Sequence, residues 1–268
     1  MDQFSSRANH EIDYKIIGEE MQYVEIELDP NETAIAEAGS FLLMDDGIQM
    51  QTIFGDGATQ NQGIMGKLFS AGKRLLTGES LFMTAYTNLA QGKKRVSFAS
   101  PYPGKIIPLD LQQLDGRIIC QKDSFLCAAK GVSIGIEFQR KLGTGLFGGE
   151  GFIMQKLEGD GMAFVHAGGH VFERYLTPGE VLKVDTGCLV AYSSSVDFDI
   201  QFIGGIKNSI FGGEGLFFAT VRGPGKVWLQ TLPISRLASR IISYGTFKRK
   251  EEGSILGGIG NMLDGDGY

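Results

Sequence analysis

Three glutamates that follow glycine are the residues whose type and spacing most suggest chemistry. Glu79, Glu150 and Glu214 occur in the sequences TGESLF, GGEGF and GGEGLF, separated by 71 and 64 residues. A sequence that recurs at a nearly fixed period marks one structural unit used repeatedly. Equivalent carboxylates from three units could meet around a pseudo-threefold axis and bind a cation. They could also pair with the basic residues that precede them, Arg74, Lys141 and Lys207.

An ion pair or a hydrogen bond to loop amides is the simpler interpretation of these glutamates, and we adopt it. The candidate structural or binding loop comprises five repeat-equivalent residues: Glu79, Glu150, Glu214, Gly149 and Gly213. The segment from Gly145 to Gly151 is rich in glycine, but it lacks the Lys-Ser/Thr pair of a phosphate-binding loop and leads into a β segment instead of a helix. We therefore predict no metal and no cofactor.

The histidines and cysteines give little support for catalysis. His166 and His170 have a spacing that binds one metal ion from a helix, but glycines between them disfavour a helix. Four residues along a strand separate two side chains by about 13 Å, so we expect ordinary surface or inter-strand histidines. Cys120, Cys127 and Cys188 lie in or beside apolar segments, which predicts buried free thiols. We predict no catalytic residue and no enzymatic activity.

Short β-strands must position the glycine-glutamate loops. Alternating apolar and polar residues bounded by Gly, Pro, Asn and Asp indicate half-buried antiparallel strands. This pattern opens each unit, at Tyr23–Leu28, Lys105–Leu111 and Val171–Leu176, and about six such segments follow one another in a unit. We predict an all-β fold of three tandem repeats, each of β-sandwich or double-stranded β-helix type, packed as a single domain over residues 14–243. The repeats are expected to cover residues of about 18–104, 105–168 and 169–234.

Composition agrees with this fold class. Glycine supplies 39 of 268 residues, about twice its average share, and it suits turns that need a positive φ. Hydrophobic residues make up 43% of the chain, enough for a sizeable core. The net charge of −6 argues against a nucleic-acid partner, although a local basic face remains open. The first residues lack the pattern of a secretory signal, and no apolar run approaches the roughly 18–20 residues that span a bilayer. We expect a cytoplasmic protein.

Two surface segments and a tail stand apart from the strands. Residues 63–76 combine Leu and Ile with Lys and Arg, so this segment could contact a membrane surface; packing between repeats or subunits is the interpretation we favour. Ser235 is expected to cap a short C-terminal helix. Residues 244–268 are rich in glycine and are predicted to form a flexible tail.

The repeated Gly-Gly-Glu-Gly pattern, together with the closing sequence GPGKVWLQT at Gly223–Thr231, resembles a bacterial family related to the mitochondrial "altered inheritance of mitochondria" proteins. The resemblance covers residues of about 14–243, and the closing sequence is its most specific part. It implies a β fold like that of the tryptophan RNA-binding attenuation protein, triplicated within one chain. It also implies a homotrimer, because some family members are described as trimers.

Taken together, these observations predict a non-enzymatic oligomeric β scaffold or binding protein that supports membrane or protein-complex organisation. Its expected partners are two further copies of the chain and an unknown protein. RNA or nucleotide binding, by analogy with the attenuation protein, is the alternative. It needs exposed aromatic rings beside basic residues. Tyr102 near Lys105 and Trp228 near Lys226 are the candidates, and both are expected to fill cores or hairpins instead.

Overall fold

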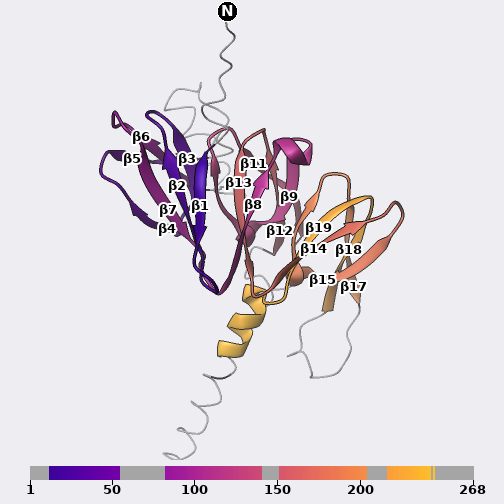
Figure 1. Ribbon diagram of the computed structural model, residues 1–268. Helices are drawn as coiled ribbons and strands as arrows, with labels where there is room; N and C mark the ends of the chain where they lie inside the picture. The colour runs from indigo at the N-terminus through magenta and orange to yellow at the C-terminus, as the bar shows by residue number, and fades with distance from the viewer. Residues whose placement is uncertain (1–11, 55–81, 141–150, 204–215, 243, 245–268) are drawn as a thin grey trace, which may run out of the picture.

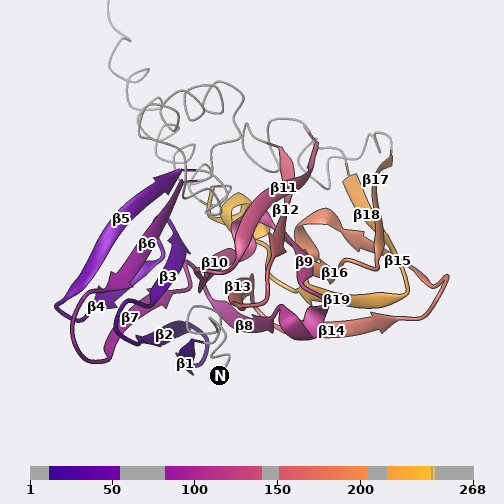
Figure 2. The ribbon, with the colours of Figure 1, turned by 90° about the horizontal axis from the view of Figure 1, so that it is seen from above.

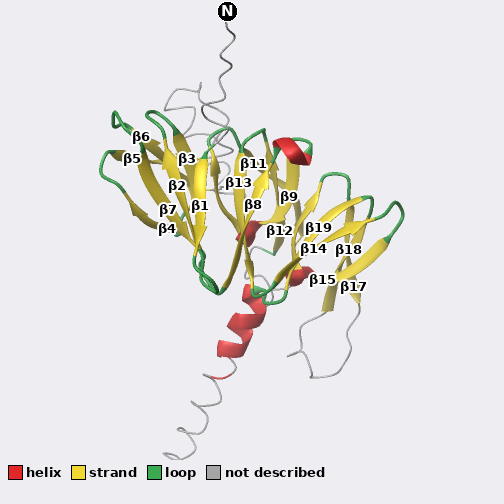
Figure 3. Cartoon of the chain, in the orientation of Figure 1, coloured by secondary structure: helices red, strands yellow, loops and turns green. Residues whose placement is uncertain are grey.

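Within the described residues, the regular secondary structure is mainly β-strand. The computed structural model describes residues 12–54, 82–140, 151–203, 216–242 and 244. Within these ranges, antiparallel sheets are accompanied by three short 3-10 turns and one helix at residues 234–242 (Figure 3). The predicted all-β class with a short C-terminal helix is confirmed.

After β1 (Asp13–Ile17), the described strands form three consecutive sets of six. The first strand set contains β2 (Tyr23–Leu28), β3 (Thr33–Glu37), β4 (Phe41–Met44), β5 (Ile48–Phe54), β6 (Phe82–Asn88) and β7 (Lys94–Ala99). The second strand set contains β8 (Gly104–Asp110), β9 (Arg117–Gln121), β10 (Phe125–Ala129), β11 (Ser133–Arg140), β12 (Phe152–Glu158) and β13 (Met162–Gly168). The third strand set contains β14 (Val171–Leu176), β15 (Val181–Asp185), β16 (Leu189–Ser193), β17 (Asp197–Ile203), β18 (Leu216–Arg222) and β19 (Gly225–Gln230).

The same four antiparallel strand pairs occur in every set. The first strand pairs with the sixth, the second with the fifth, the third with the sixth and the fourth with the fifth. The third strand also carries a register shift at the same place each time, after Phe41, Phe125 and Leu189. A β-bulge of this kind bends its strand and increases the local twist, so the third strand of each set curves at an equivalent position.

Neighbouring sets are joined by one further kind of strand pair. The second strand of one set pairs with the third strand of the next set, as β3–β10 and as β9–β16. These junctions create two six-stranded sheets, ordered β5-β6-β3-β10-β13-β8 and β11-β12-β9-β16-β19-β14. A four-stranded sheet, β1-β2-β7-β4, and a three-stranded sheet, β15-β18-β17, lie at the two ends (Figures 1 and 2).

Burial explains which residues form which strands. In β2, Val24, Ile26 and Leu28 are fully buried while the residues between them are partly exposed, as expected for a sheet with one face on the core. In β10, by contrast, all five residues are buried, because the strand lies at a junction between two sets. Small residues such as Cys127 and Ala128 allow this close packing, and three hydrophobic clusters result along the chain.

The C-terminal helix begins at residue 234, two residues earlier than a cap at Ser235 would place it. The carbonyl of Pro233 accepts hydrogen bonds from the backbone N–H groups of Arg236 and Leu237, at 3.0 and 3.2 Å. Ser235 therefore lies in the first turn and is not the cap, so that prediction is wrong; proline before the helix already has a suitable φ. Apart from Tyr244, the predicted tail at 244–268 lies outside the described residues.

Candidate interaction surface

The loop residues singled out in the sequence are not among those that the structure describes. Glu79, Glu150, Glu214, Gly149 and Gly213 all fall in ranges outside it, as does the segment 63–76. In the sequence, each loop lies between the fourth and fifth strands of its set. The structural or binding role of these loops therefore stays a prediction.

The two histidines have different surroundings, one buried and one exposed. His166 is buried on β13, where its ring meets Tyr102 edge-to-face at 4.4 Å between centroids. Burial lowers the pKa of His166 to about 4, so it is neutral at physiological pH. His170 lies exposed in the turn before β14, and its backbone N–H donates to Oγ1 of Thr231 at 2.9 Å. Among the described residues, no three His, Cys, Asp or Glu side chains are grouped closely enough to hold a metal ion.

The free cysteines do not have the surroundings of a reactive thiol. Cys120 and Cys127 are buried, as predicted, and Cys188 is partly buried. Burial raises the pKa of Cys120 to about 12, and the nearby carboxylate of Glu37 acts in the same direction. Burial likewise raises the pKa values of Cys127 and Cys188. A thiol that stays protonated is a poor nucleophile and a poor metal ligand.

Glu37, at the end of β3, is a partly buried carboxyl group close to the first junction. Burial raises its pKa from 4.5 to about 7; the negative charge of Asp123 adds to this shift, and Lys122 opposes it. Because the folded protein favours the protonated form, this group's stabilising contribution is fully present below about pH 4.5. It is lost as the pH rises through about 7.

We therefore expect Glu37→Gln to stabilise the protein at pH 8, by about 1–3 kcal/mol in free energy of unfolding, and to have little effect at pH 4.5. Glutamine keeps the shape of the protonated acid but cannot ionise. Urea unfolding at the two pH values provides the measurement. The exposed Glu19→Gln is the control and should change neither value. An equal effect of Glu37→Gln at both pH values would contradict the explanation.

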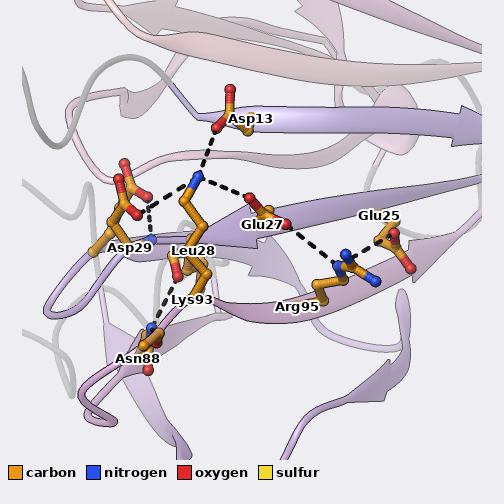
Figure 4. Close-up of polar contacts among 10 residues, drawn as sticks. Asp13, Glu25, Glu27, Leu28, Asp29, Asn88, Lys93 and Arg95 are labelled. Atoms are coloured by element: carbon orange, nitrogen blue, oxygen red, sulfur yellow. Dashed lines mark hydrogen bonds and ion pairs between the residues drawn. The ribbon is translucent and has the colours of Figure 1, made fainter.

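An exposed ionic network fastens β1 to the first strand set (Figure 4). Nζ of Lys93 lies 3.3 Å from Asp13, 2.8 Å from Glu27 and 3.8 Å from Asp29. Arg95 adds a contact to Glu27 at 3.4 Å. These charges raise the pKa of Lys93 and lower that of Glu27. Exposed ion pairs of this type contribute little to stability; the network joins Asp13 on β1 to Glu27 on β2 through Lys93.

A second polar contact in the same region is buried. The Nδ2 group of Asn88 donates to the backbone carbonyls of Leu28 and Gly92, each at 2.8 Å, and its Oδ1 accepts from the N–H of Ala90 at 2.9 Å. Three satisfied hydrogen bonds around a buried amide fix the turn between β6 and β7 against β2. The role of Asn88 is structural.

The aromatic rings considered for RNA stacking are occupied within the fold. Tyr102 packs on His166, and Trp228 is 2% exposed. The indole N–H of Trp228 donates to Glu173 at 2.7 Å, and Nζ of Lys226 lies 4.9 Å from the ring centroid. A ring held by these contacts does not present a face to an unpaired base, so the expectation that these residues fill the core is confirmed.

The main candidate interaction surfaces are two edge strands, β4 and β15, which lie at opposite ends of the molecule (Figures 1 and 2). β4 is the edge of the four-stranded sheet, and β15 is the edge of the three-stranded sheet. Phe41, Leu42 and Leu43 on β4 are 40%, 45% and 48% exposed, although all three are apolar. On β15, Val181 is 46% exposed. Clustered apolar residues on an unpaired edge are typical of an interaction surface.

Comparison with known proteins gives the family. Residues 14–232 match the family model described as "Mitochondrial biogenesis AIM24". The chain belongs to the AIM24 family. An uncharacterized protein of Streptococcus pyogenes serotype M6 is 30% identical to it over 239 residues, which cover 87% of this chain and 89% of the relative.

A solved structure supports the fold of this AIM24 family member. A crystal structure of a Streptococcus pyogenes protein superimposes with a TM-score of 0.67 and 23% sequence identity, covering 87% of this chain and all of the other. In the part of the chain that the structure describes, no helix is both long enough and apolar enough to cross a membrane.

Proposed function

We propose that this AIM24 family member is a non-enzymatic, homotrimeric β scaffold of the cytoplasm. In this proposal its three strand sets are three copies of one unit, with a fold like that of the tryptophan RNA-binding attenuation protein. The observation that carries it is the recurrence of the same four strand pairs, with the same bulge, in all three sets. Likeness of fold alone does not give a function, so the surface that the described fold leaves open provides a second, separate support for the proposal.

That surface is suited to assembly. Among the described strands, β4 presents apolar side chains and an unpaired backbone edge at one end of the molecule, and β15 presents an unpaired edge at the other. Backbone groups on a sheet edge pair readily with another strand. A scaffold of several chains would in turn offer a large β surface to a protein partner or to a membrane.

Native mass spectrometry of gently purified protein tests the proposal. With a chain mass of 29.1 kDa, three copies give 3 × 29.1 = 87.3 kDa, and we expect this species without additional mass. A species of 29.1 kDa at every concentration would contradict assembly. Retained nucleotide or metal would contradict the non-enzymatic scaffold. Retained RNA that is released at higher salt would instead support the RNA-binding alternative.

A further inference from the structure

Unpaired strand edges occur throughout the described fold, but those of β4 and β15 differ from the others. The fourth strands β5, β11 and β17 are sheet edges in all three sets. The second and third strands behave differently: at both internal junctions they pair with each other across neighbouring sets. Within the described chain, two of these strands lack this pairing. They are β4, the third strand of the first set, and β15, the second strand of the third set.

The residue types of β4 match a strand that is covered. Its counterparts β10 and β16 are buried almost throughout, because β3 and β9 pair with them. β4 keeps apolar residues at the equivalent positions, yet Leu42 and Leu43 are exposed. Phe41 even stacks on Tyr86 of the neighbouring sheet, at 5.7 Å between ring centroids, and still remains 40% exposed. Burial of these exposed Leu and Phe side chains against a partner strand would remove apolar surface from water and so favour the contact.

β15 is likewise less buried than its counterparts in the other two sets. Its counterparts β3 and β9 have four buried residues each, whereas Val184 is the one buried residue of β15. Lys183 is the position at which β15 departs from an apolar strand, since Ile35 and Ile119 are the equivalent residues. Its aliphatic stem can cover an apolar neighbour while its ammonium stays in water, and a lysine on an edge strand restrains uncontrolled strand addition.

We propose that β15 of one copy pairs with β4 of a second copy, repeating between chains the junction that joins the sets within a chain. This inference rests on the self-assembly proposed above and names its interface. β4 and β15 lie at opposite ends of the molecule in both views, so one chain does not close on itself (Figures 1 and 2). The contact is head-to-tail, and a head-to-tail contact forms a closed ring when its rotation permits. Three copies would close such a ring.

The internal junctions also give the register of this contact. Cys127 lies opposite Ala36, and Ala191 lies opposite Cys120. On β4 the equivalent residue is Leu43, which follows the bulge as Cys127 and Ala191 do. On β15 it is Val184, the fourth residue of its strand like Ala36 and Cys120. The antiparallel register therefore sets Leu43 opposite Val184 and, one residue further along, Met44 opposite Lys183.

Two variants that each block one edge test the contact. The β4 variant is Leu42→Asp with Leu43→Asp, and the β15 variant is Val181→Asp with Lys183→Asp; the changed side chains are exposed in the single chain. Burying unpaired carboxylates should weaken the contact at least about 1000-fold. We expect each variant alone to be a monomer by light scattering. An equimolar mixture should give a pair of 2 × 29.1 = 58.2 kDa, because each variant retains one working edge.

The control carries the same chemistry on a different edge strand. Phe172→Asp with Tyr175→Asp changes two exposed residues of β14, and it should assemble as the unchanged protein does. Circular dichroism verifies that every variant is folded; the two-chain species in the mixture is independent evidence of folding. If the unchanged protein assembles but the β4 and β15 variants assemble equally well, this interface is wrong and the scaffold proposal survives. If the unchanged protein is itself a monomer, both fail.

Discussion

Gly104→Ala is expected to destabilise the fold by at least about 3 kcal/mol, which corresponds to a loss of roughly 6–12 °C in melting temperature. Gly104 opens β8 and pairs with Gly168 of β13. A Cβ atom at this position would lie 2.0 Å from the carbonyl oxygen of Ala167 and 2.8 Å from the Cα of Gly168. Because these are backbone atoms, no side-chain rotation relieves the overlap, and the two strands must separate.

Gly92→Ala is the matched control for this experiment. A Cβ atom there meets nothing within 4 Å, and the residue is not in the left-handed region. Its effect should stay within about 0.5 kcal/mol. Thermal unfolding of both variants at one protein concentration provides the comparison. Equal melting temperatures for the two variants would show that the close approach of β8 and β13 does not exclude a side chain at position 104.

Trp228→Ala is expected to cost about 3–5 kcal/mol in free energy of unfolding. Trp228 belongs to a cluster that also includes Ile35 of the first strand set and Ile118 of the second. The side chain thus links the core of the third set to those of the other two. Its removal leaves a cavity at this common core and deprives Glu173 of its indole hydrogen bond.

Tyr175→Ala provides the control for the tryptophan variant, because Tyr175 is also aromatic but is 68% exposed. We expect its effect to remain within about 0.5 kcal/mol. Chemical denaturation measures both variants, and the slope of the transition shows whether unfolding stays cooperative. If Trp228→Ala cost no more than Tyr175→Ala, the shared core would not link the three sets as described.

The strands could be predicted where one face is buried. Alternation in β2, for example, follows directly from Val24, Ile26 and Leu28 pointing to the core. The sequence around β10 does not alternate, because both faces of that strand are buried. β1 was not predicted, since its residues are mostly exposed and it is held by pairing with β2 and by Lys93. Short strands that depend on a neighbour carry a weak local signal.

The candidate surface was also beyond the sequence. Leu42 and Leu43 are apolar residues of the kind usually found in a core, so the sequence gives no sign that they are exposed. Only the sheet order shows that, among the described strands, theirs has no partner on one side. Pairing between β3 and β10 joins residues about 90 positions apart, such as Ile35 and Ala128, and strand propensity does not encode such contacts. The glycine-glutamate loops could be recognised in the sequence because they recur, but they lie outside the described residues.

Disulfide trapping tests the central claim most directly. In a chain carrying Cys188→Ser, the pair Met44→Cys and Lys183→Cys should link neighbouring copies on mild oxidation, because these positions lie opposite each other in the proposed register. The pair Met44→Cys and Leu182→Cys is shifted by one residue, which places the two thiols on opposite faces of the sheet. We expect linked chains from the first pair and almost none from the second on a non-reducing gel. Absence of linkage from the first pair, or equal linkage from both, would contradict the β4–β15 junction.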